Sequence, residues 1–139
     1  MNKTYLPDEV SVITAGSIIT GLADGDSISI ERNEDTFTLA VGSQGDTTRT
    51  RNANKSGRIT LTLQQTSESN EVLQNLLIAD EANGNGFFPI LIRDNSGKDL
   101  HVAEEAWIVR QPSAAYGKES GTREWIIETG SLRSFIGGN

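Results

Sequence analysis

Polar and apolar residues alternate with a period of two in several short segments, which is the pattern of strands with one buried face. The clearest case is 58–65, where Ile59, Leu61 and Leu63 alternate with polar residues. The same alternation predicts strands at 28–31 and 37–41. Apolar segments predict further strands at 10–13, 18–19, 87–92, 100–102, 106–110, 124–129 and 132–136.

Turn residues separate these segments. Ala15-Gly16 predicts a hairpin turn, and the Gly, Asn and Asp residues of 21–26, 33–35 and 93–98 predict further turns. The apolar run 87–92 is nearly continuous, so we expect both of its faces to be covered. Pro89 lacks a backbone donor, which favours an edge or a bulge in that strand.

Residues 42–57 interrupt the strand pattern. Ala53 is their only apolar residue, so they cannot form a core by themselves. Hairpin loops usually span about 2–5 residues. The segment is therefore predicted to be a long polar loop.

One helix is predicted at 70–81, with Ser69 as its N-cap and Asn83-Gly84 at its end. Ile78 falls on the opposite side from the core and should be exposed. The core face of the helix should hold Val72, Leu73, Leu76, Leu77 and Ala79. The elements together predict a mainly β protein, a β-sandwich or partly rolled barrel with one flanking helix.

Length and composition narrow the class of protein. The 139 residues suffice for a single domain, 1–139. The absence of Cys excludes disulfides and thiol catalysis. We expect no membrane segment, because no apolar run approaches about 20 residues, and no signal peptide pattern is present. The net charge of −7 argues against a wide nucleic-acid-binding face.

Candidate metal and histidine chemistry is weak. Asp24-Gly25-Asp26 and 94–99 contain oxygen ligands but lack the spacing of a calcium loop, so we interpret both as turns. His101 is the only histidine and is interpreted as a structural or surface residue.

Carboxylate pairs occur at Glu34-Asp35, Glu104-Glu105 and Glu124/Glu128. Glycosidase chemistry needs two carboxyl groups across a cleft, whereas Glu104 and Glu105 should point to opposite faces of their strand. We interpret all three pairs as solvated surface, and we expect no catalytic residue, metal or cofactor.

A basic cluster stands out in this acidic chain. It comprises Arg49, Arg51, Lys55 and Arg58, with Asp46 beside it. One interpretation is a solvated, mobile loop. The other is that the cluster binds the acidic surface of a second copy, which as a heterologous contact would generate rings or open stacks.

Blocks of residues along the chain are similar, in the same order, to one family. They are Gly21–Gly25, Ile28–Asp35, Lys55–Leu63, Gln65–Ser67, Ser69-Asn70, Gly117–Glu119, Thr122–Trp125 and Gly137–Asn139. From Val10 to Asn139 the chain resembles the tail tube proteins of long-tailed phages, mainly contractile ones.

The resemblance implies a structural virion protein rather than an enzyme. Such proteins form hexameric rings, in which strands of all subunits close one continuous barrel, and the rings stack into the hollow tube of the tail. The implied partners are other copies of the chain, the tail sheath, a baseplate or tube initiator, a terminator and the tape measure protein. Phage DNA passes through without specific binding, and assembly takes place in the host cytoplasm.

The resemblance also assigns expected surfaces. The loop 42–57 would be disordered in a free subunit and stack on the next ring, with contacts from Asp46, Thr47, Arg49, Arg51, Asn52, Asn54 and Lys55. Candidate residues of the lumen wall are Ser27, Ser29, Glu31, Thr36, Thr38, Thr60, Thr62 and Gln64. Candidates for the outer, sheath-facing side are Gln74, Asn75 and Ile78.

Alternative functions remain open at this point. The tube of a phage-derived injection system, such as a contractile bacteriocin or a type VI secretion tube, would use the same kind of subunit. A carbohydrate-binding sandwich would need clustered exposed aromatics, yet Trp107 and Trp125 lie in apolar strands. An enzyme lacks support from any motif.

Overall fold

The computed structural model describes residues 3–138, so Met1, Asn2 and Asn139, at the ends of the expected domain and of its C-terminal motif, lie outside the described residues. A short 3-10 helix at Pro7–Glu9 precedes the strands. The elements are β1 (Val10–Thr14), β2 (Ser17–Ile18), β3 (Ile28–Arg32), β4 (Phe37–Val41), β5 (Thr47–Arg51), β6 (Gly57–Gln64), α1 (Ser69–Asn83), β7 (Phe88–Asp94), β8 (Leu100–Arg110), β9 (Thr122–Thr129) and β10 (Arg133–Phe135).

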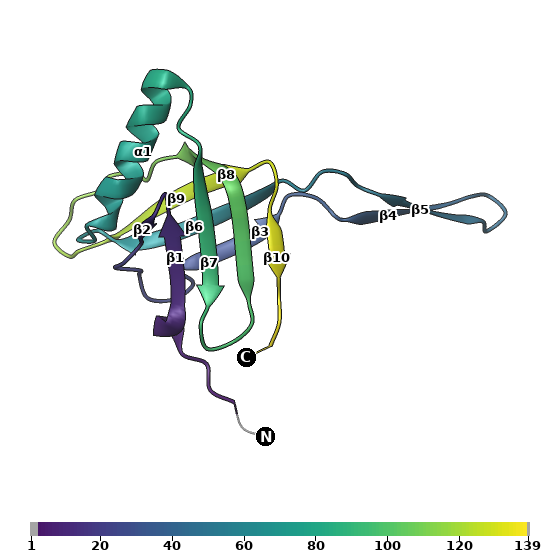
Figure 1. Cartoon of the computed structure of the whole chain (residues 1–139), viewed down its shortest axis with the longest axis horizontal. Coiled ribbons are helices and arrows are strands. Elements are labelled where there is room, and N and C mark those ends of the chain that lie inside the picture. The colour runs from purple at the N-terminus through teal and green to yellow at the C-terminus, as the bar shows by residue number, and fades with distance from the viewer. Residues whose placement is uncertain (1–2, 139) are drawn as a thin grey trace.

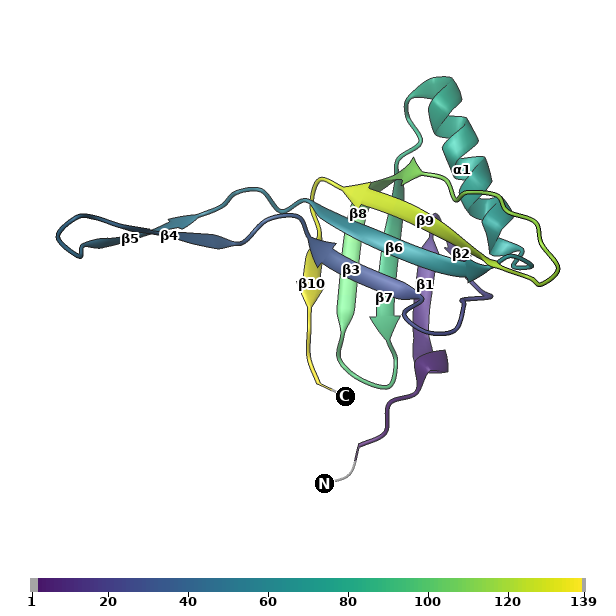
Figure 2. The same cartoon turned by 180° about the vertical axis from the view of Figure 1, so that it is seen from behind.

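One antiparallel sheet runs in the order β2-β1-β7-β8-β9-β6-β3, and β10 also pairs with β8. The long strand β8 joins the two halves, because its first part pairs with β7 and β10 and its last part with β9. The sheet folds over at β8, so that β1 and β7 cross β9, β6 and β3 (Figures 1 and 2). The predicted mainly β fold is confirmed. No ladder within the described residues joins β2 to β3, so a closed barrel is not formed.

The core lies between the two halves of the folded sheet. Ile59, Leu61 and Leu63 of β6 are buried, as their alternation predicts, and Trp125 and Ile127 of β9 join them. Full burial of such side chains stabilises the fold by about 1.5–3 kcal/mol each. The other core residues are Val12, Ile19, Leu73, Phe88, Ile90, Ile92, Ala103, Ala106, Ile108 and Leu132.

Helix α1 covers one end of this core. Leu73 is fully buried and Leu76 and Leu77 pack against the core, but Ala79 is exposed, contrary to the prediction. Ser69 is not the N-cap. It is the first helical residue, and its Oγ accepts a 2.9 Å hydrogen bond from the backbone N–H of Thr20.

The predicted end of the helix is confirmed. Gly84 has a φ of +69°, the left-handed cap conformation, and its N–H donates to the Asp80 carbonyl over 2.7 Å. No helix within residues 3–138 is both long enough and apolar enough to cross a membrane.

The segment 42–57 differs from the predicted loop. Its residues Thr47–Arg51 form β5, which pairs with β4 in a separate two-stranded sheet. This hairpin projects away from the folded sheet (Figure 1). All residues of β4 are exposed, so its alternation does not indicate burial within the chain.

Strands β7 and β8 also depart from the predictions. Phe87 and Pro89 are exposed and Leu91 is half-buried, so the second face of the run 87–92 is covered only in part. Pro89 lies in a central strand, opposite a register shift in which Phe88–Ile90 faces Ala103–Ala106. A bulge therefore occurs at Pro89 as predicted, but its extra residue lies in β8 rather than in the strand of Pro89. The two strands predicted at 100–102 and 106–110 are one strand.

Candidate assembly surfaces

The β4–β5 hairpin has an amphipathic face. The register places six side chains on it: Phe37, Leu39 and Val41 from β4, with Thr47, Arg49 and Arg51 from β5. Leu39 is 68% exposed and Val41 is 64% exposed. The Arg49 guanidinium carbon lies 4.3 Å from the centre of the Phe37 ring, in a cation–π contact. Apolar surface and two cations therefore share one uncovered face.

The predicted stacking residues lie at different parts of the hairpin. Asp46 lies at the tip, where its carbonyl accepts a 2.7 Å hydrogen bond from the Gly42 N–H. Asn52, Asn54 and Lys55 instead lie at the base. Asn52 Nδ2 donates to Glu34 Oε2 over 2.6 Å, and the Lys55 carbonyl accepts from the Leu132 N–H over 2.8 Å.

Only part of the predicted stacking set therefore projects from the body. Asp46, Thr47, Arg49 and Arg51 do so, and the structure does not bring the other three to the tip. Sequence reasoning misses Phe37, Leu39 and Val41, because the alternation of a strand predicts that its apolar face is buried. The Thr-Arg alternation of 47–51 was the available signal for a pairing strand.

Six of the eight candidate lumen residues lie together on the outer face of β3 and β6. Ser29 pairs with Thr60, and the Ser27 carbonyl accepts a 2.8 Å hydrogen bond from the Thr62 N–H. Glu31 and Gln64 follow at the same period along their strands. Thr36 and Thr38 are not brought to this face, because they precede and enter the separate hairpin.

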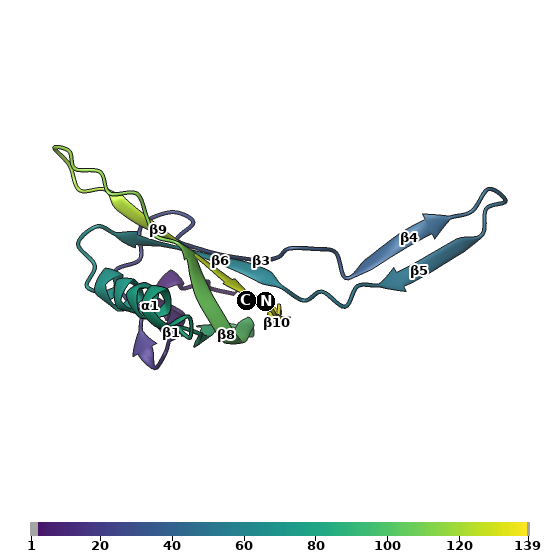
Figure 3. The same ribbon diagram turned by 90° about the horizontal axis from the view of Figure 1, so that it is seen from above.

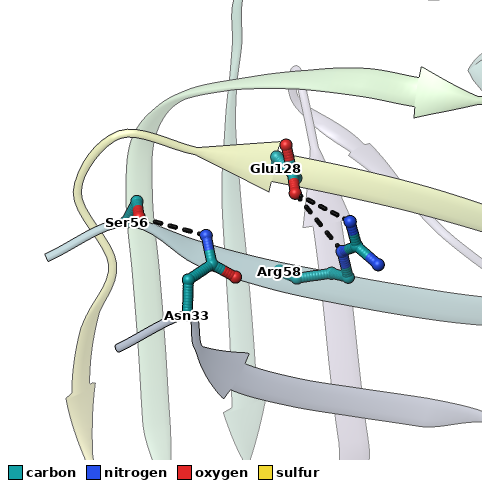
Figure 4. Close-up of polar contacts among 4 residues, drawn as sticks. All are labelled: Asn33, Ser56, Arg58 and Glu128. Carbon is teal, nitrogen blue, oxygen red and sulfur yellow. Dashed lines mark hydrogen bonds and ion pairs between the residues drawn. The ribbon is translucent and has the colours of Figure 1, made fainter. Parts of the chain in front are cut away.

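A row of four residues, three of them charged, crosses the same face. The ladders align Glu31, Arg58, Glu128 and Trp107 across β3, β6, β9 and β8. Arg58 does not belong with the hairpin cations, because its Nη2 and Nε donate to Glu128 Oε1 over 3.0 and 3.3 Å (Figure 4). Beside this pair, Asn33 Nδ2 donates to Ser56 Oγ over 3.0 Å and links the two ends of the hairpin base.

The same face extends onto β9 through Glu124, which pairs with Thr62. The sequence reasoning did not include Arg58, Glu124 or Glu128 in this surface. Glu124 and Glu128 are four residues apart, an even separation that places both on one face of a strand, and this was the signal for the β9 part.

Glu104 and Glu105 do not point to opposite faces. The register shifts between Ala103 and Ala106, so both carboxylates are exposed and line one cavity of about 450 Å³. Trp107 borders this cavity, and Arg133 Nη2 donates to Glu104 Oε1 over 3.0 Å. The cavity lies beside the hairpin base, since Ser131, another lining residue, bridges to Lys55.

A second cavity, of about 480 Å³, lies at the other end of β6, between the start of α1 and the β8–β9 connection. Glu68 and Glu71 line its helical side, and Pro112 and Ala114 line the side of the connection. Asn70 fixes this wall, because its Oδ1 accepts a 2.9 Å hydrogen bond from Nε1 of the buried Trp125. Figures 1 and 3 show the connection and the hairpin at opposite ends of the molecule.

The three outer-face candidates lie on α1 but are not equivalent. Asn75 is exposed and Ile78 is 53% exposed, as predicted for Ile78. Gln74 is half-buried, and its Nε2 donates to Gln111 Oε1 over 3.4 Å.

The remaining polar candidates serve the fold. Asp26 follows the turn residue Gly25, whose φ is +85°. Asp94 Oδ1 accepts hydrogen bonds from the N–H and Oγ of Ser96 in the β7–β8 turn. Within the described residues, no group of three or more His, Asp or Glu residues could hold a metal ion.

His101 shares a 2.7 Å hydrogen bond with Ser134 Oγ. Burial lowers the pKa of His101 below its ordinary value of 6.5, while Asp99 acts in the opposite direction.

Comparisons of the sequence and of the structure with known proteins give similar results. The sequence model of the bacteriophage PhiTE tail tube protein family matches residues 10–137. A structural protein, ORF10 of Pseudomonas phage KPP10, is 38% identical to this chain over an alignment of 145 residues, gaps included. The alignment covers 99% of this chain and 84% of that protein.

Two solved structures share the fold. One is the extended sheath–tube complex of PVC, an extracellular contractile injection system, with a TM-score of 0.65 and 14% identity over 95% of this chain and 91% of the other. The second is the tube-terminating cap of the anti-feeding prophage, with a TM-score of 0.61 and 12% identity over 97% and 93% of the two chains.

Proposed function

The chain belongs to the bacteriophage PhiTE tail tube protein family, and from that premise we propose how this structural component of the virion tail assembles. Its copies form hexameric rings, and the rings stack into a hollow tube through which phage DNA is delivered. The observation that supports this most directly is the half-sheet β8-β9-β6-β3, which has one face in the core and one mainly polar outer face.

The half-sheet has an unpaired edge at β3. Hydrogen bonds join Thr62 to Ser27 and Asn33 to Ser56, and bonded pairs alternate along an antiparallel ladder. The backbone groups of Ile28, Ile30 and Arg32 therefore point away from β6. Within the described residues no strand pairs with this edge, so it can accept a strand of the next subunit.

The opposite edge of the half-sheet is the last part of β8. The pairing of β8 with β7 ends at Ala106, whereas β8 continues to Arg110 alongside β9. Two edges thus lie at the two sides of the same four strands. Pairing β3 of one copy with β8 of the next would close the sheets of a ring into one barrel.

The outer face of the half-sheet would line the bore. In Figure 3, α1 and β1 lie on one side of β3, β6 and β9, which leaves the other side uncovered. The carboxylates of Glu31, Glu124 and Glu128 lie on this face. They outnumber its two guanidinium groups, which belong to Arg58, bound by Glu128, and to Arg110, opposite Ile126. An excess of negative charge repels DNA phosphates and lets the DNA slide without being held.

The other surfaces support further parts of the proposal. The hairpin, with Asp46, Thr47, Arg49 and Arg51, stacks on the next ring. Asn75 and Ile78, which are exposed on α1, face a tail sheath. An initiator at the baseplate, a terminator and a tape measure protein complete the tail, which assembles in the host cytoplasm without a membrane step and without enzymatic activity.

Electron microscopy of the purified chain at high concentration tests the ring. Sixfold end views and hollow tubes are the expected result, and rings of another symmetry would contradict the hexamer. Phages that carry Glu31→Lys and Glu124→Lys should assemble tails but eject DNA more slowly, because the reversed charges attract phosphates. Unchanged ejection kinetics would remove this face from the bore.

A further inference from the structure

We infer that the cavity between α1 and the β8–β9 connection receives the β4–β5 hairpin of a second copy. This inference rests on the proposed stacking of rings and names the surface that the hairpin binds. The inference is carried by an amphipathic, cationic hairpin at one end of the subunit and an acidic, partly apolar cavity at the other. Figures 1 and 3 show the hairpin and the β8–β9 connection, which lines that cavity, at opposite ends of the molecule.

The hairpin needs an intermolecular cover. Leu39 and Val41 are 68% and 64% exposed on the face that also carries Arg49 and Arg51. Neither arginine forms an ion pair with any residue in the described range 3–138. Contiguous apolar surface rimmed by charge is typical of a binding surface rather than of solvated surface.

The cavity is complementary to this face. Glu68 and Glu71 are exposed acids on its helical wall, and Pro112 and Ala114 provide apolar surface on the facing wall. Arg123 is the lining cation, and its guanidinium lies toward the ring of Tyr116, 5.7 Å from the ring centre. The arginines of a hairpin would therefore meet carboxylates, while its aliphatic side chains meet Pro112 and Ala114.

The geometry requires that the contact join different copies. The hairpin base, which includes Asn52 and Lys55, comes just before the start of β6 at Gly57. The cavity lies past the other end of this eight-residue strand. A strand of that length spans about 26 Å. The hairpin points away from α1 and from the β8–β9 connection, which line the cavity (Figure 3). A contact between opposite ends of identical subunits is heterologous, so it repeats from copy to copy and generates a ring or an open stack. Between the proposed stacked rings it would give the open stack.

Charge reversal tests the pairing of the two surfaces. Both Arg49→Glu/Arg51→Glu and Glu68→Arg/Glu71→Arg should reduce sedimentable tubes about tenfold or more, and the four changes combined in one chain should restore them. The matched control is Glu104→Arg/Glu105→Arg, which reverses two exposed acids at the hairpin end and should leave tubes unchanged. Tubes at the wild-type level from Glu68→Arg/Glu71→Arg would overturn the inference and leave the proposed tube intact.

Cross-linking provides a second readout that does not depend on stability. Because the chain has no Cys, Leu39→Cys with Ala114→Cys should give a ladder of oxidised multimers. Leu39→Cys with Ser131→Cys, which pairs the hairpin with its own end of the subunit, should not. Equal ladders from both pairs would overturn the inference. A ladder from the first pair alone, in samples that show no sixfold rings, would uphold the docking and contradict the hexamer.

Discussion

Gly57 is the first residue of β6, directly after the base of the hairpin. Its replacement by Ala should destabilise the subunit. A Cβ at this position would lie 2.5 Å from Leu132 Cδ2, 2.8 Å from Leu132 Cβ and 3.0 Å from the Glu31 carbonyl oxygen. Leu132 is only 1% exposed, so it has little room to move. Overpacking of this kind costs about 1–3 kcal/mol of unfolding free energy.

Thermal unfolding of unassembled subunits at low concentration measures this cost. For a chain of this size, a change of 1 kcal/mol shifts Tm by about 3–5 °C, so Gly57→Ala should lower Tm by about 3–15 °C. The matched control is Gly130→Ala, because a Cβ there meets no atom within 4 Å. The free energy of unfolding of the control should stay within about 0.5 kcal/mol of the wild-type value.

A double-mutant cycle tests the assigned cause. Leu132→Ala alone should cost about 2–5 kcal/mol, because it leaves a cavity in the core. Combined with Gly57→Ala, the loss of unfolding free energy should be smaller than the sum by about 0.5 kcal/mol or more. Removal of Leu132 Cδ2 relieves the shortest approach, while those to the Cβ of residue 132 and to the Glu31 carbonyl oxygen remain. Additive losses, or a Gly57→Ala variant as stable as Gly130→Ala, would refute the steric argument.

Three further changes have expected outcomes. Asn70→Ala removes the acceptor of the buried Trp125 Nε1–H and should lower the free energy of unfolding by about 1–3 kcal/mol. The midpoint of urea unfolding measures this loss, and an unchanged midpoint would contradict it. Gly45→Ala, at a φ of +88°, should strain the hairpin tip and slow tube assembly without lowering Tm of the body. The lowered pKa of His101 means that the unfolded chain binds its proton more readily, so the stability contributed by the neutral ring is present above pH 6.5 and falls below it. His101→Asn should therefore show a smaller loss of Tm between pH 7.5 and 5.5 than the wild type, and an equal loss would argue against the histidine as the cause.

The parts of the fold that depend on local pattern could be predicted from the sequence. The alternation of Ile59, Leu61 and Leu63 located β6 correctly, because the buried face of a strand determines which residues are apolar. The end of α1 at Gly84 was predictable for the same local reason, since glycine readily adopts the left-handed conformation.

The parts that failed depend on contacts that are distant in sequence or lie outside the subunit. Leu39 and Val41 alternate as core residues do, yet no element of the described chain covers them, and sequence pattern does not distinguish a core face from a binding face. The directions of the Glu104 and Glu105 side chains depend on the register between β7 and β8, which the sequence does not give. Ser69 resembled a cap, but the proximity of Thr20, far away in sequence, gave its hydroxyl a different partner.

Strand β6 has a mechanical consequence for the assembled tail. It leads from the hairpin base to the acidic cavity, and it is flanked along its length by β9 and over five residues by β3. Tension between stacked copies would act along β6, parallel to its axis. Ladder hydrogen bonds lie perpendicular to the strands, so they would be loaded together in shear rather than opened one after another. A tube built this way would resist stretching with the combined strength of two ladders in every subunit.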